Sequence, residues 1–370
     1  MTSTNETLDM AKNSLRKRFN SNSLQQLLIF ATWIVLLIGF SIADPHFMRM
    51  GNIVALLLAS AVTGIQALGV TFTIATGGID ITPGLGMAMT GVITAMCMTA
   101  FHLPIWLAVL AGILSGAVLG WINGLLIAGF GVQPMIATLA MMLVAQGVAL
   151  ILSGSKPVYT TDEVGFDRIA RGTQILGIPN AVWIFLAVAV ISWIVLNKTR
   201  LGRYALSMGS NEEATRMSGV NVRRWKWAVY VLAGCFTGLS GVVMTSRLSA
   251  AQPATGSGYE MYAIAAAVIG GASLAGGRAS ITGTVIGALI ITTINNGLQI
   301  MSVPDPWQKV FLGIVVIAAV LVDIYRQHNA KKGQMIGQVH GTHDSAVYTV
   351  FITEQRLSNR FILTTTRRLQ

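Results

Sequence analysis

The chain has 370 residues, of which 53% are hydrophobic and only 11% are charged. Soluble domains carry charge on roughly a quarter of their residues, so this composition excludes an ordinary soluble enzyme. The formal net charge of +11 would suit a nucleic-acid-binding protein, but the basic residues lie between and outside the apolar stretches, where they determine membrane topology. We therefore expect no nucleic-acid partner and extensive contact with membrane lipid.

The apolar residues form stretches close to the roughly 20 residues that an α-helix needs to cross a bilayer. The alternating pattern of outer-membrane barrel strands does not occur. The first stretch is too long for a signal-peptide core and lacks a small-residue cleavage site, so we expect it to remain as an anchor. The sequence predicts an all-α polytopic membrane protein of about ten transmembrane helices, at about 24–42, 51–75, 83–101, 104–130, 134–153, 180–196, 227–247, 261–277, 280–302 and 307–324.

Glycine and proline interrupt this pattern at several places. Gly77-Gly78 and Pro83-Gly84 bracket Asp80, and similar interruptions occur at 129–134 and at 270–277. Non-helical backbone at membrane depth survives only where protein or a water-filled cavity covers it. We therefore expect broken or re-entrant segments at these places.

Clusters of Lys and Arg predict the orientation, because short cytoplasmic loops carry an excess of both. One cluster precedes the first span, one lies between the sixth and seventh spans, and one follows the last: Lys12, Arg16, Lys17 and Arg18; Lys198, Arg200, Arg203, Arg216, Arg223, Arg224 and Lys226; Arg326, Lys331 and Lys332. Both termini are expected in the cytoplasm and segment 154–179 outside. The predicted organisation is a cytoplasmic segment (1–23), a transmembrane domain (24–326) and a tail of unknown role (327–370).

The motifs of common catalytic sites do not occur in the sequence. It contains no Gly-x-x-x-x-Gly-Lys-Ser/Thr phosphate loop, no His-Glu-x-x-His and no Cys-x-x-Cys. Its two cysteines, Cys97 and Cys235, lie in apolar segments and are expected to be small core residues. We expect no metal site, no cofactor bound by this chain and no enzymatic activity of its own.

Asp80 is the carboxylate closest to the middle of the apolar sequence, and an ionisable group there suggests function. Two roles are open: capping the third span through its N-terminal amides, or contacting a solute or gate directly. Other polar residues in apolar segments could line a neutral path or bond between helices, among them Gln66, Thr71, Thr73, Asn123, Gln133, Gln146, Asn295, Asn296 and Gln299. Our path or gate candidates are Asp80, Asn123, Gln133, Asn295 and Asn296.

The basic connection between the sixth and seventh spans contains a short predicted helix. Ser210 or Asn211 can cap it, Glu212 and Glu213 suit its first turn, and Gly219 can end it in the left-handed conformation. Ala214 and Met217 share one face and could enter a groove of a partner, with Arg216 beside them. The alternative is a helix on the membrane surface, held by anionic lipid.

Around this helix the sequence resembles the membrane subunits of bacterial ABC importers, specifically the ribose-type monosaccharide permeases. The segment Ser210–Asn221 is similar to the cytoplasmic coupling segment of that family. The likeness extends over residues 24–326 and includes Thr76–Ile81, Gln133–Leu139, Thr199–Tyr204, Ser249–Pro253, Gly258–Glu260 and Gly270–Gly277. Glu213 departs from the general Glu-Ala-Ala pattern, and the tail after His328 has no counterpart in the family.

The resemblance implies a homodimer in the bacterial inner membrane that imports a monosaccharide, either a ribose-like pentose or a hexose. It also implies a periplasmic sugar-binding protein and a cytoplasmic ABC ATPase that uses ATP and Mg. The coupling residues would be Asn211, Glu212, Glu213, Ala214, Arg216, Met217 and Gly219. The alternatives are an ion-coupled secondary transporter of a neutral solute, an ABC permease for an amino acid or nucleoside, and a membrane scaffold without transport activity.

Overall fold

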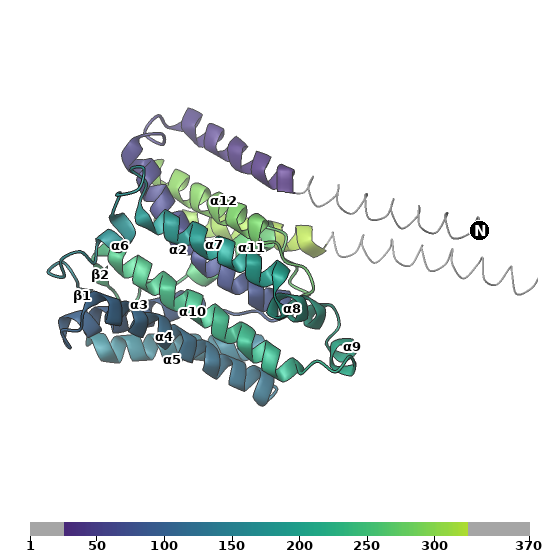
Figure 1. The fold of residues 1–370 in the computed structure, drawn as a ribbon. Helices are drawn as coiled ribbons and strands as arrows, with labels where there is room; N and C mark the ends of the chain where they lie inside the picture. Colours follow the sequence, from purple (N-terminus) through teal and green to yellow (C-terminus); the bar gives the residue numbers. More distant parts are fainter. Residues whose placement is uncertain (1–25, 325–370) are drawn as a thin grey trace, which may run out of the picture. The chain divides into compact units, whose positions relative to one another are not determined.

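The computed structural model of the protein describes residues 26–324, so the predicted N-terminal segment (1–23) and the tail (327–370) lie outside the described residues. Within this range, eight helices are long and apolar enough to cross a membrane. They are Gln26–Ala43, α2 (Met50–Ala75), Ile105–Gly129, α5 (Pro134–Ser153), α7 (Asn180–Lys198), α10 (Val222–Leu248), α12 (Ile281–Ile300) and Asp305–Ile324 (Figure 1). The all-α, polytopic fold class is confirmed.

Two of the predicted spans are shorter helices. α3 (Pro83–Thr99) has 17 residues and α11 (Tyr259–Ile269) has 11. The prediction of a span over 261–277 was wrong in its second half, because α11 ends at Ile269 and residues 270–280 are not helical. Gly271, Gly276 and Gly277 adopt φ values of 98°, 85° and 74°, a region that favours glycine and cannot continue a right-handed helix.

The interruptions predicted near Asp80 and Pro134 are also confirmed. The chain leaves α2 after Ala75, and Gly77 has φ 81°. The span over 104–130 comprises α4 (Ile105–Gly124) and one π-helical turn, η1 (Leu125–Gly129). Gly131 then takes φ 75° before α5 begins at Pro134.

The core is built around α2 and α10. In each of these helices 72% of the apolar stretch is buried, against 6% in Gln26–Ala43. α10 lies against α4 through glycines on both helices, so that a side chain added at Gly116 would come within 2.6 Å of the Gly238 nitrogen. Small residues allow this close approach of two backbones, which replaces the hydrophobic driving force that is absent between helices in lipid.

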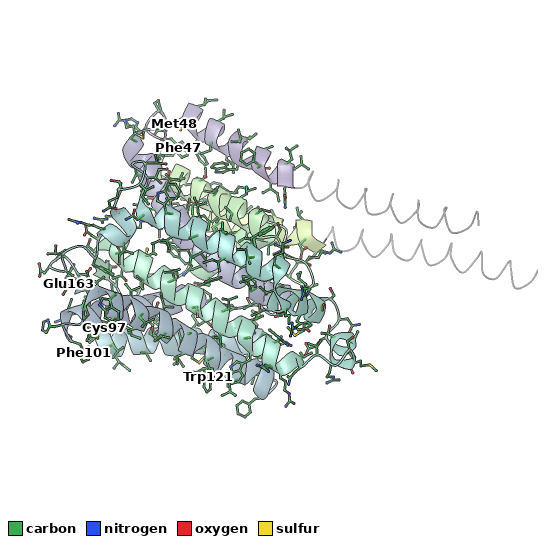
Figure 2. The ribbon with its side chains drawn as sticks, in the orientation of Figure 1. Phe47, Met48, Cys97, Phe101, Trp121 and Glu163 are labelled. Atoms are coloured by element: carbon green, nitrogen blue, oxygen red, sulfur yellow. The ribbon has the colours of Figure 1, made fainter. Side chains whose placement is uncertain are left out.

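The short elements lie at opposite ends of these helices (Figure 1). At one end, β1 (Val158–Tyr159) pairs antiparallel with β2 (Ala250–Ala251), and the labelled side chains of Phe101 and Glu163 are found there (Figure 2). α6 (Arg168–Arg171) also belongs to this end and packs on α10 through the Ser246 hydroxyl, which accepts from the Ala170 amide at 3.0 Å. At the other end lie α8 (Arg200–Ser210) and α9 (Glu212–Met217).

Candidate functional site

α9 is the short helix predicted in the basic connection. Asn211 is extended, and its side-chain oxygen accepts from the Ala214 amide at 2.9 Å. Of the two predicted candidates, Ser210 and Asn211, the N-cap is therefore Asn211. The helix ends after Met217, and Gly219 follows with φ 81°. A capping side chain at one end and a left-handed glycine at the other explain why so short a helix forms here.

Both acidic residues of α9 pair with cations. Arg216 donates to Glu213 at 2.5 Å, and this hydrogen bond, followed by the positive charge, lowers the pKa of Glu213 below its ordinary value. Lys226, in the first turns of α10, donates to Glu212 at 2.6 Å. The second pair fastens α9 to α10, the helix that packs against α2, α3 and α4.

α9 exposes small and apolar residues beside charged residues of both signs, namely Glu212, Glu213 and Arg216. Met217 is 81% exposed and Ala214 is also exposed, whereas Thr215 between them is buried. An open groove runs between α8 and α9, lined by Tyr204, Leu206, Ser207, Ser210, Asn211, Ala214, Thr215, Ser218 and Val220. Four arginines of the neighbouring helices are exposed as well: Arg200 and Arg203 in α8, and Arg223 and Arg224 in the first turn of α10. This surface can receive an apolar contact with charged groups beside it.

A second cluster forms around the break between α2 and α3. Asp80 is only 3% exposed, and its carboxylate accepts from the Thr82 amide at 3.0 Å. Asn123 donates to the Thr82 hydroxyl at 2.7 Å, which in turn donates to the Thr138 carbonyl at 3.2 Å. The structure therefore brings Asp80 and Asn123 together through Thr82. Asp80 bonds the residue before Pro83, so it turns the chain into α3 and does not bond the amides of its first turn.

Two further polar groups lie around this break: Tyr230, which was not named from the sequence, and Gln66, which was named but not chosen as a path or gate candidate. The Tyr230 hydroxyl of α10 occupies the space beside Gly78, where any side chain at position 78 would collide with it. Gln66 of α2 donates to the Pro83 carbonyl at 3.0 Å. Among the described residues, the Gln66 and Asn123 side-chain oxygens and the Tyr230 hydroxyl have no hydrogen-bond partner although they are buried. A tyrosine or glutamine in an apolar helix carries no sequence signal of such a location.

The remaining path candidates lie elsewhere. Asn296 and Asn52 exchange hydrogen bonds of 2.8 Å at the beginning of α2, whereas Asp80 follows its end. A helix of 26 residues spans roughly 39 Å, so Asn296 and its neighbour Asn295 do not join the Asp80 cluster. Gln133, at the N-cap of α5, has an exposed side chain.

Comparison with known proteins identifies the family to which the chain belongs. A family model described as the permease component of the branched-chain amino acid transport system matches residues 52–320. The ribose import permease protein RbsC of Escherichia coli K12 is 40% identical over 317 residues, which cover 84% of this chain and 98% of that protein. The chain belongs to the ribose-type permeases of ABC importers.

Other relatives of this permease are named for several monosaccharides. RbsC of Bacillus subtilis is 43% identical over 81% of this chain and 93% of its own length. The D-allose permease AlsC of Escherichia coli K12 is 39% identical over 80% of this chain and 90% of its own length, and the L-arabinose permease AraH of the same strain is 37% identical over 81% and 90%. No solved structure matches. The chain is thus a monosaccharide ABC permease subunit, which decides among the alternatives left open by the sequence.

The described part of this permease contains no group of three or more His, Cys, Asp or Glu side chains that could hold a metal ion. Cys97 and Cys235 are both free and partly buried, as expected of small residues in apolar helices.

Proposed function

We propose that α9 docks this permease onto a cytoplasmic ABC ATPase, and that ATP and Mg bind to that ATPase. The observation that carries this proposal is the capped α9 helix, which exposes Ala214 and Met217 beside the Arg216–Glu213 ion pair in a connection rich in basic residues. An isolated helix of this length is unstable, so the Asn211 cap and the Lys226–Glu212 pair maintain a shape that is useful only if something binds it.

The opposite end of the helices is the proposed docking face for a periplasmic sugar-binding protein. Pairing of β1 with β2 joins segment 154–179 to the residues that follow α10. This end exposes charges of both signs, at Lys156, Asp162 and Arg168. Mixed charge suits a partner that must bind in one orientation and then leave.

We also propose that two copies of the chain form the translocation path in the bacterial inner membrane. Within one copy, α2 and α10 are closely packed, and α4 and α10 approach at backbone distance. A polar sugar cannot pass through such an interior without separating it. A path bounded by two copies removes that difficulty, and a ribose-like pentose or a hexose is the proposed solute.

Reconstitution tests this function. The permease, its ATPase and its binding protein are placed in proteoliposomes, and uptake of labelled ribose, arabinose and allose is measured. We expect accumulation of one of these sugars only with ATP and the binding protein. Uptake driven by a proton or sodium gradient in the absence of the ATPase would contradict the proposal.

The docking role of α9 is tested separately by replacing Glu212, Glu213 and Gly219 with alanine. Loss of the Lys226 pair and of the left-handed terminus is expected to distort α9 and to reduce ATP-dependent uptake and copurification of the ATPase. Unchanged uptake in this triple variant would show that α9 does not couple the two subunits.

A further inference from the structure

The last residues of α8 contact two of the three broken segments of the membrane domain, those that follow α2 and α11. Gly209 and Ser210 end α8 directly before the Asn211 cap of α9. A side chain added at Gly209 would collide with the Ala75 carbonyl oxygen and the Gly277 nitrogen. Those two atoms are themselves joined, since the Gly277 amide donates to the Ala75 carbonyl at 3.0 Å. Three chain segments therefore meet at one point with only backbone between them.

Gly276 completes the contact. A side chain added at this residue would lie 2.8 Å from the Cα and carbonyl oxygen of Gly209 and 2.8 Å from the Gly77 nitrogen. Gly77, Gly276 and Gly277 also have positive φ, so the backbone conformation favours glycine at all three, and the lack of space requires it at Gly276 and Gly277 as well. We call Gly77, Gly209, Gly276 and Gly277 the glycine junction.

The junction connects α9 with both breaks over a short path. Asn211 alone separates α8 from α9, and its amide donates to the Ser207 carbonyl at 3.0 Å, so the end of α8 must follow a displacement of α9. On the other side of the junction, Gly77 leads to Asp80, and Gly277 leads to Ser280, which caps α12. Contacts between backbones cannot relax by a change of rotamer, and packed protein interiors transmit strain.

We propose that the glycine junction carries the displacement of α9 to the α2–α3 break and the α11–α12 break together, and so couples the ATPase to the path. This inference rests on the proposed docking of an ATPase at α9. The competing view is that these glycines only allow close packing. The two views differ in their consequences, because a relay can be interrupted while the ATPase stays bound, whereas loss of packing lowers the amount of folded complex.

Gly209→Ala tests the junction, with Gly147→Ala as its matched control. Both glycines lie in helices, but a side chain at Gly147 of α5 would meet no atom within 4 Å. In the reconstituted complex we expect Gly209→Ala to copurify with the ATPase while its ATP-dependent uptake falls by about tenfold, within the usual range of coupling between two sites. Stimulation of ATP hydrolysis by the loaded binding protein should fall with it. If Gly209→Ala transports sugar as fast as Gly147→Ala, the proposal is overturned.

Hydrogen exchange on the wild-type complex provides a test that does not depend on the folding of a variant. When the ATPase is trapped with a non-hydrolysable ATP analogue, we expect exchange to change together in residues 205–217, 75–82 and 270–280, with no change around Gly147. A change confined to 205–217 would overturn the relay. Wild-type complex that takes up no sugar would instead contradict the proposed function, so the two failures are distinguishable.

Discussion

Asp80 accepts a backbone hydrogen bond inside the break between α2 and α3, where the flanking residues are buried. An asparagine retains an oxygen in the same place, so Asp80→Asn should keep the turn and most of the uptake. Asp80→Ala removes the acceptor and leaves the buried Thr82 amide without this partner, which should lower stability by about 1–3 kcal/mol. Thermal unfolding of the purified permease and sugar uptake measure the two effects. An Asp80→Asn variant as impaired as Asp80→Ala would instead indicate that the solute or gate requires the charge.

The limits of sequence reasoning are visible at the same residue. A carboxylate between Gly77-Gly78 and Pro83-Gly84 predicts a broken segment, with capping of the third span and contact with a solute or gate as its two open roles. The break is confirmed, but the carboxylate does not bond the first-turn amides of α3. The approach of Asn123 through Thr82 was not predictable, because it depends on how α3, α4 and α5 pack. Asn296 carries the same polar signal as Asn123, yet it pairs with Asn52 far from Asp80. Residue type thus identifies candidates, but only the packing of distant segments brings them together.

The α9 helix depends on its cap, because so few residues cannot otherwise hold a helical conformation. Asn211→Ala removes the acceptor for the Ala214 amide and should destabilise α9 by about 1 kcal/mol. Asn211→Ser retains a capping oxygen and is the control. We expect ATP-dependent uptake to fall in the alanine variant and to remain near wild type in the serine variant. Equal uptake by both would mean that α9 folds on its partner without the cap.

The ion pair between Glu212 and Lys226 is the second interaction that holds α9 in place, after the Asn211 cap. Lys226 is 16% exposed and Glu212 is 53% exposed, so the bond is partly shielded from water. Exposed pairs contribute roughly 0.2–1 kcal/mol, so we expect Glu212→Lys and Lys226→Glu each to reduce uptake and the exchanged pair to recover part of it. A double-mutant cycle of uptake rates measures this coupling. If the exchanged pair is as defective as the sum of the single variants, the two residues act independently.

The helices themselves were largely predictable, because about 20 consecutive apolar residues have few other stable conformations in lipid. The residues at which helices end near glycine were less predictable. Double glycines signalled the break after α11, but they did not show that the helix stops at Ile269. The β1–β2 pair was not predicted either, since two residues per strand carry no periodicity and the pairing joins segments far apart in sequence.

The membrane orientation of the subunit is a prediction from the distribution of its charges, and it can be measured. Two exposed residues mark the two ends of the helices: Asp162 lies beside Glu163 at the β1–β2 end, and Arg223 lies in the first turn of α10, near α9, at the other end (Figures 1 and 2). Since Lys and Arg are enriched in cytoplasmic loops, the α9 end should face the cytoplasm. After replacement of Cys97 and Cys235 by alanine, a cysteine can be introduced at one exposed position at a time.

With a membrane-impermeant maleimide, Asp162→Cys should react in cells whose outer membrane has been permeabilised but whose inner membrane is intact. Arg223→Cys should react only after the inner membrane is opened. Both positions are exposed, so accessibility from one side decides the labelling. The reverse pattern would place α9 outside, where no ATP is available, and the proposed docking of an ATPase would fail with it. The chain crosses the membrane once between the two positions, through α7. Labelling of both positions before the inner membrane is opened would mean that they lie on the same side, and this crossing would be wrong.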